Sequence, residues 1–103
     1  MKKIVIYDHA AVREYKRFSR EVQKDFQAHI EILEAKGKLE FPGGKKVTKD
    51  LFEIRVARKG IYRGFYAYVK RDFVVILHFF RKKTQKTPLK NIRVAGMRLK
   101  KYA

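Results

Sequence analysis

The pattern of the first half of the chain predicts one short strand followed by two helices. Residues 4–7 are apolar and rich in β-branched side chains, which favours a strand, and Asp8 can then cap a helix over residues 10–18. Ser19 can cap a second helix, whose apolar positions recur at helical spacing until Gly37 ends it. The stripe on this second helix consists of Val22, Phe26, His29, Ile30 and Leu33.

Three apolar stretches in the second half of the chain predict an antiparallel meander. They cover residues 51–57, 61–70 and 73–80. The first two are joined by a short loop that ends at Gly60, where a positive φ is needed, and the last two by Arg71 and Asp72. Residues 36–50 are rich in glycine and lysine, so we expect a loop or a weakly paired strand before the meander.

A final helix should follow the meander and complete one domain. Thr87 can cap this helix, with Pro88 at its first position. Its buried stripe should consist of Leu89, Ile92, Ala95, Leu99 and Tyr102. The element order predicts an α+β fold over residues 1–103. In this fold, the N-terminal strand and the meander form a small antiparallel sheet, which packs with two N-terminal helices and one C-terminal helix.

The lengths of the two turns predict the register of the meander. A three-residue first loop places Arg55 opposite Arg63, and a two-residue second turn places Phe65 opposite His78. Because side chains alternate between faces, one face should be polar. It would hold Glu53, Arg55, Arg63, His78 and Phe80. The opposite, apolar face would hold Phe52, Ile54, Val56, Tyr62, Gly64, Tyr66, Tyr68, Phe73, Val75, Leu77 and Phe79.

The charge of the chain points to a polyanionic partner. There are 27 Lys and Arg against 10 Asp and Glu, a net charge of +17, and no acidic residue follows Phe73. Solubility alone needs a net charge of only about 2 to 8 in a small domain. Nucleic acid is the expected partner, with a merely soluble basic surface as the alternative.

The N-terminus and the absence of cysteine bear on localisation. A chain without cysteine fits a reducing compartment. The first apolar run stops at Asp8, which is too early for a signal peptide, and no apolar run reaches membrane-spanning length. We therefore expect a cytoplasmic protein without a membrane partner.

Two features of the sequence are suited to binding phosphate. Arginines directly opposite each other in a sheet repel by roughly a few tenths to 1 kcal/mol, and a phosphate gripped by both would relieve this. Glu53 could also neutralise them, which would leave a plain salt-bridge patch. His78 on the same face is a candidate base, although strand histidines are more often structural. Residues 43–46, Gly-Gly-Lys-Lys, hint at a phosphate cradle but fail the P-loop pattern.

Three blocks of the sequence resemble the RelE/ParE toxin superfamily, in its phage-derived HigB-like branch. They are LFEIR at 51–55, GIYRGFY at 60–66 and LHFFRKKTQKTP at 77–88. The last block is the most specific one. Gly64 and Phe79 depart from the family pattern, in which a bulkier apolar residue and a small one are expected, and a compensating exchange of size would account for both.

The resemblance implies a RelE-like fold and the toxin of a type II toxin–antitoxin pair. Such a toxin cleaves messenger RNA on the translating ribosome and is neutralised by an antitoxin, usually a small helix-turn-helix protein. The implied reaction needs no metal or cofactor, because the RNA 2′-hydroxyl attacks the adjacent phosphate. The sequence agrees in having no HExxH motif, no cysteine pair and no carboxylate cluster.

The resemblance also assigns roles to individual residues. Arg55 and Arg63 match the strand arginines that hold the scissile phosphate. Lys82 and Lys83 match a basic pair that stabilises the transition state or transfers protons, and His78 is a second candidate base. The residues expected to contact RNA are Lys59, Arg81, Lys86, Arg98 and Tyr102.

Two other functions remain open at this stage. A ParE-like inhibitor of DNA gyrase would share the fold but would not need the arginine pair or the lysine run. An inactive basic module would bind nucleic acid, with a steep dependence on salt, but would not cleave it.

Overall fold

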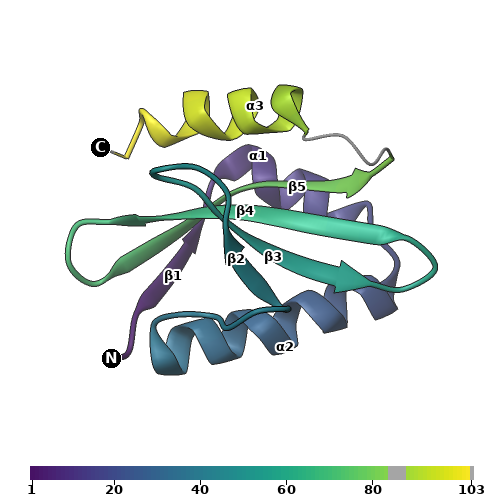
Figure 1. Ribbon diagram of the computed structural model, residues 1–103, viewed down its shortest axis with the longest axis horizontal. Coiled ribbons are helices and arrows are strands. Elements are labelled where there is room, and N and C mark those ends of the chain that lie inside the picture. The colour runs from purple at the N-terminus through teal and green to yellow at the C-terminus, as the bar shows by residue number, and fades with distance from the viewer. Residues whose placement is uncertain (84–87, 103) are drawn as a thin grey trace.

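The computed structural model describes residues 1–83 and 88–102. Its elements are β1 (Ile4–Tyr7), α1 (His9–Lys16), α2 (Arg20–Lys36), β2 (Gly44–Lys46), β3 (Phe52–Ala57), β4 (Ile61–Val69), β5 (Phe73–Lys82) and α3 (Leu89–Leu99). One five-stranded sheet has the order β1-β5-β4-β3-β2, with α2 against one face and α3 against the other (Figure 1). The predicted α+β fold is confirmed.

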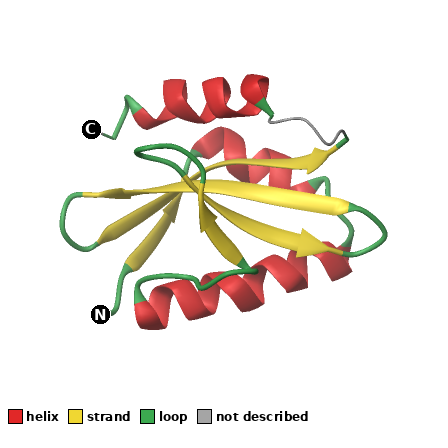
Figure 2. Cartoon of the chain, in the orientation of Figure 1, coloured by secondary structure: helices red, strands yellow, loops and turns green. Residues whose placement is uncertain are grey.

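The expectation that the N-terminal strand joins an antiparallel sheet is wrong, and of the two alternatives for residues 36–50 the structure contains the weakly paired strand. β1 pairs in parallel with β5, whereas the other neighbours are antiparallel (Figure 2). The glycine- and lysine-rich segment contributes the short edge strand β2, which pairs with β3. None of the described helices is long and apolar enough to cross a membrane.

The predicted caps of the first two helices are confirmed. The Asp8 side chain accepts a hydrogen bond from the Ala10 amide, and the Ser19 hydroxyl accepts one from the Val22 amide. Gly37 ends α2 with a φ of 79°, a conformation that glycine adopts without the strain of a Cβ atom.

The start of α3 differs from the prediction. Pro88 precedes the helix and offers no side-chain cap, and Leu89 is 64% exposed rather than buried. Thr87, the predicted cap, lies outside the described residues. The rest of the stripe packs as expected, because Ile92, Leu99 and Tyr102 contact the core around Ala95.

The register of the first hairpin is confirmed, including Arg55 opposite Arg63. The second turn has three residues rather than two, since Val69 pairs with Phe73. A bulge in the β4–β5 pairing between Phe65 and Tyr66 then shifts the register, so Phe65 still pairs with His78.

The bulge corrects the predicted apolar face. Val75 and Leu77 pack on the α3 side of the sheet, not with Phe79, because side chains before the bulge are displaced by one position. The core on the α2 side includes Phe26, Ile30, Leu33, Ile54, Tyr66, Val74, Ile76 and Phe79. The core on the α3 side includes Leu51, Phe65, Ala67, Val75, Leu77, Phe80 and Ala95.

Gly64 and Phe79 exchange size across the sheet. They are directly paired, and a Cβ atom on Gly64 would lie 3.0 Å from the Phe79 ring. The ring thus occupies the space that a side chain at position 64 would otherwise fill. This exchange is the one that the departure from the family pattern predicted.

Candidate active site

A buried ion pair lies in the polar face of the meander. The Arg63 Nη1 donates to Glu53 Oε1 at 3.0 Å, with the side chains 13% and 3% exposed respectively. Arg55 lies half-buried opposite Arg63. The Nε of Arg63 is buried and has no hydrogen-bond partner in the part of the chain that the structure describes. An unpaired buried donor costs about 1–3 kcal/mol, so the contact with Glu53 holds the guanidinium in a position where its Nε is not satisfied by the described residues.

A cavity of about 270 Å³ opens beside this ion pair. It is lined by Lys45, Lys46, Val47, Glu53, Arg63, Lys82 and Pro88. The cations come from three strands, because β2, β4 and β5 each contribute to the wall. Among the described lining residues there are one carboxylate and four cations, which makes the cavity suitable for an anion such as phosphate.

Lys45 and Lys46 are the site residues that sequence reasoning missed. Residues 43–46 fail the P-loop pattern, but the edge strand that they form places Lys45 opposite Glu53. The signal was the lysine pair after two glycines, yet its position depends on the pairing of β2 with β3. Of the predicted catalytic residues, Arg63 and Lys82 share the cavity, and Lys83 follows β5 as an exposed side chain.

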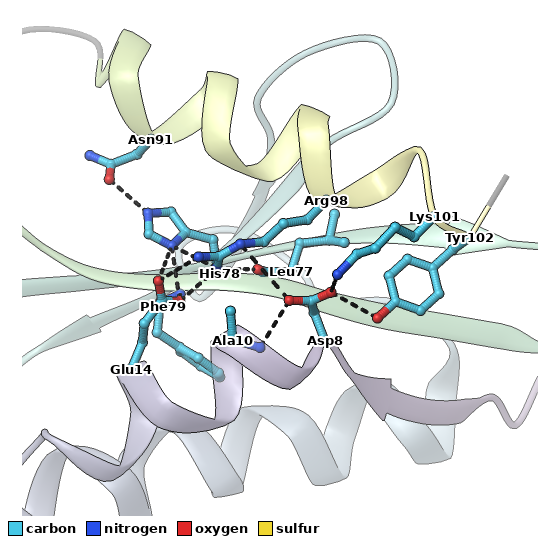
Figure 3. A network of polar contacts seen from close by, with 10 residues as sticks. All are labelled: Asp8, Ala10, Glu14, Leu77, His78, Phe79, Asn91, Arg98, Lys101 and Tyr102. Carbon is cyan, nitrogen blue, oxygen red and sulfur yellow. Dashed lines mark hydrogen bonds and ion pairs between the residues drawn. The ribbon is translucent and has the colours of Figure 1, made fainter.

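His78 lies in a separate polar network under α3 (Figure 3). Its side chain is only 9% exposed, and its Nδ1 lies 3.0 Å from the carboxylate of Glu14 on α1. Its Nε2 lies 2.7 Å from Asn91 Oδ1 in the first turn of α3. Both ring nitrogens therefore face acceptors inside the fold. The surroundings differ from the expected ones, in which two arginines flank the ring.

Arg98 belongs to the same network. Its Nη1 and Nη2 donate to the two carboxylate oxygens of Glu14 at 2.9 and 3.0 Å, and Nη1 also donates to the Leu77 carbonyl. These contacts tie α3 to α1 and β5 (Figure 3). The guanidinium, which the sequence predicts to contact RNA, is thus engaged within the protein.

Tyr102 and Lys101 converge on Asp8, whose side chain is fully buried. The Tyr102 hydroxyl donates to Asp8 Oδ1 at 2.8 Å, and the Lys101 Nζ lies 2.6 Å from the same oxygen. Lys59 lies in the β3–β4 turn and Arg81 lies near the end of β5, where its Nη2 donates to the Lys59 carbonyl. Both are exposed. The predicted RNA contact Lys86 lies outside the described residues.

Because of this network, we expect the free energy of unfolding to fall at acidic pH. Burial would raise the pKa of Glu14, but hydrogen bonds from His78, Arg98 and the Phe79 amide outweigh it and lower the pKa from 4.5 to about 2. A depressed carboxyl pKa stabilises the fold fully above about pH 4.5, and this contribution is lost as the pH falls towards 2. We expect the free energy of unfolding to fall by roughly 3 kcal/mol over this range from Glu14 alone.

Urea unfolding at a series of pH values checks this dependence. The Glu14→Gln variant should lose stability less steeply between pH 4.5 and 2, the range set by the Glu14 pKa. Equal slopes for the variant and the natural chain would contradict the assignment. Asp8, whose pKa is also lowered because hydrogen bonds from Lys101 and Tyr102 outweigh its burial, remains in both proteins.

Comparison with solved structures identifies the fold as that of the RelE toxin from E. coli. A double arginine-to-alanine variant of that toxin in the free state has a TM-score of 0.70 to this chain, with 14% identity and all of both chains covered. The isolated E. coli RelE toxin has a TM-score of 0.64 at 12% identity, covering 92% of this chain and 98% of that one. The RelE-like fold that the resemblance implied is confirmed.

The sequence comparison defines the family more closely. Residues 13–100 match the family described as phage-derived protein Gp49-like, and the chain belongs to that family. This agrees with the phage-derived branch to which the three sequence blocks point. No curated protein matches the chain.

Proposed function

We propose that this protein is the toxin of a type II toxin–antitoxin pair and that it cleaves messenger RNA on the ribosome without a metal or cofactor. The main support is Arg63, which lines a cavity together with three lysines from β2 and β5. A phosphate in this cavity would accept from the Arg63 guanidinium and be surrounded by Lys45, Lys46 and Lys82. The RelE fold and the Gp49-like family add support from outside the site.

The proposed reaction forms one bond to phosphorus and breaks another. The RNA 2′-oxygen attacks the adjacent phosphorus and loses its proton, and the bond to the 5′-oxygen breaks as that oxygen gains a proton. The products are a cyclic phosphate and a 5′-hydroxyl. Arg63 and Arg55 stabilise the dianionic phosphorane, and Lys82 or Lys83 serves in proton transfer. Glu53 holds the Arg63 guanidinium in position through its 3.0 Å contact.

We assign His78 a positioning role rather than that of a base. Its contact with Glu14 joins β5 to α1, and its contact with Asn91 joins β5 to the first turn of α3. Pro88, just before α3, forms part of the cavity wall. His78 therefore helps to hold the start of α3, and with it Pro88, in place beside the cavity. Exposed Lys59, Arg81 and Lys83 remain proposed contacts for the RNA or the ribosome.

The distribution of charge indicates which side of the protein faces the RNA. α2 carries four acidic and three basic side chains, a net charge of −1 in a chain of net charge +17. The excess of cations is therefore carried by the rest of the molecule, including the sheet edge with β2 and the end of β5. We infer that α2 faces away from the polyanion.

Expression from a tightly controlled promoter tests the proposed activity. We expect growth arrest with new 5′ ends inside translated messages, detected by primer extension. Intact messages in arrested cells would contradict it, and DNA breaks alongside intact messages would favour the gyrase inhibitor instead. Binding to RNA without arrest or cleavage would favour the inactive module.

The proposed antitoxin partner can be tested separately. A small helix-turn-helix protein encoded beside this one should form a stable complex with it and abolish the arrest. Co-expression and co-purification of the two chains measure this directly. We place the activity in the cytoplasm because its proposed target is the translating ribosome.

A further inference from the structure

A second cationic cavity lies at the other end of β4 from Arg63. Its volume is about 440 Å³, and its walls include Lys49, Phe52, Tyr68, Lys70, Leu99 and Tyr102. Figure 1 shows the C-terminal end of α3 on the same side of the molecule as the β4–β5 turn. Six residues of β4 separate Arg63 from this end, roughly 20 Å of extended chain.

The backbone of Lys70 is in a conformation that lysine seldom adopts. Its φ is 52°, in the left-handed region where glycine has no Cβ penalty. Lys59 in the β3–β4 turn has the same φ of 52°, so the conformation is shared by the two hairpin turns. Glycine at position 70 would remove the Cβ penalty. Lys70 is exposed, and it lines the cavity together with Lys49.

Tyr102 supplies a fixed aromatic ring at the same place. Its hydroxyl is held by buried Asp8 at 2.8 Å, which Lys101 also contacts. Tyr102 and Lys70 also line an adjoining cavity of about 300 Å³. Tyr102 therefore lines both cavities. The hydrogen bond to Asp8 sets the orientation of its ring (Figure 3).

An immobilised aromatic ring beside lysines is a combination that binds single-stranded nucleic acid. The ring stacks on a base, and the ammonium groups contact the adjoining phosphates. The other lining groups suit a base too, because Phe52 and Leu99 provide apolar walls. Asp50 is the one anionic group in the lining, and it neighbours Lys49.

We propose that this cavity, the Tyr102 cavity, binds a nucleotide of single-stranded RNA a few positions from the scissile phosphate. The base stacks on Tyr102, and the phosphate contacts Lys70 and Lys49. The inference rests on the proposed function, because it gives the RNA strand a second anchor beyond the cleavage site.

The Lys70→Gly substitution separates function from stability. Glycine removes the cation and relieves the backbone strain, so the melting temperature should stay equal or rise. Binding of a single-stranded RNA of about 12 nucleotides should weaken several-fold, and the slope of log K against log salt should fall by about 0.7. Lys49→Gln should have a similar effect. The control is Lys24→Gln, which removes an exposed lysine on α2 and should leave binding unchanged.

Cross-linking locates the bound strand. An oligonucleotide carrying 4-thiouridine should cross-link to the peptide that contains Tyr102, and Lys70→Gly should reduce the yield. An unchanged salt slope in Lys70→Gly, or equal losses in Lys70→Gly and Lys24→Gln, would overturn the proposal. Both measurements are made on the isolated protein without ribosomes. The RNA-binding result for the Tyr102 cavity can therefore be interpreted even if the protein does not cleave messenger RNA in cells.

Discussion

Replacing Arg63 with lysine is expected to slow RNA cleavage about 100- to 1000-fold while leaving the protein folded. Lysine retains the positive charge beside buried Glu53, so the ion pair is preserved. It loses the planar fork of donors that can hold two phosphate oxygens at once. Single-turnover cleavage on programmed ribosomes measures the rate, and urea unfolding measures the fold.

Arg58→Lys is the matched control for this experiment. Arg58 also pairs with a carboxylate, since its Nε donates to Asp25 Oδ2 at 2.8 Å, but the pair is exposed and joins the hairpin to α2. Cleavage by Arg58→Lys should be unchanged. A folded Arg63→Lys protein that cleaves at the natural rate would remove Arg63 from the transition state.

Arg63→Ala is a less informative variant. It would leave the Glu53 carboxylate buried without its partner, which typically costs about 3–5 kcal/mol. Lost activity could then reflect unfolding. The double variant Arg63→Gln/Glu53→Gln removes both charges together, and it should recover most of the stability without recovering cleavage.

Removing the Glu14 carboxylate is expected to have the largest effect on stability. Glu14→Ala should lower the free energy of unfolding by about 3–5 kcal/mol near pH 7, because Arg98 and His78 lose their common partner. The carboxylate also accepts from the Phe79 amide, so that backbone donor is left without its partner. Urea titration followed by circular dichroism measures the change.

A surface carboxylate on α2 provides the comparison for this variant. Glu31 is exposed, so Glu31→Ala should change stability by less than about 0.5 kcal/mol. Similar losses for the two variants would mean that the network under α3 contributes little. If the network holds α3 in place, Glu14→Ala should also increase amide exchange in α3 more than in α2.

Much of the fold followed from local patterns in the sequence. The caps at Asp8 and Ser19 and the end of α2 at Gly37 are determined within a few residues, because each capping group satisfies a nearby amide or carbonyl. The first hairpin was predictable for the same reason. Its three-residue loop ends at Gly60, whose φ is 141°, and this fixed Arg55 opposite Arg63.

The second hairpin shows where local patterns were insufficient. Its turn is one residue longer than predicted, and the bulge in the β4–β5 pairing shifts the register back. Sequence alternation cannot detect such a pair of changes, since both faces of β5 are apolar and each is covered by a helix. The pairing of His78 was therefore correct, but the faces of Val75 and Leu77 were wrong.

The candidate site also has a part that the sequence predicted and a part that only the structure revealed. The blocks around Arg55, Arg63 and Lys82 pointed to a phosphate-binding face before the structure was considered. The sequence gave no comparable sign that Arg98 would be held by Glu14, 84 positions away. A list of basic residues cannot separate cations that bind a ligand from cations that stabilise the fold.

The amino-acid sequence by itself determined the order of the elements, the arginine pair of the meander and the excess of positive charge. Caps, turns and alternation act over a few positions, and net charge needs no structure at all. Only the tertiary structure decided which cations share a cavity and which form internal ion pairs. Strands β2, β3, β4 and β5 line the cavity, and α1, β5 and α3 form the ion-pair network, so both groupings join residues that are distant in the chain.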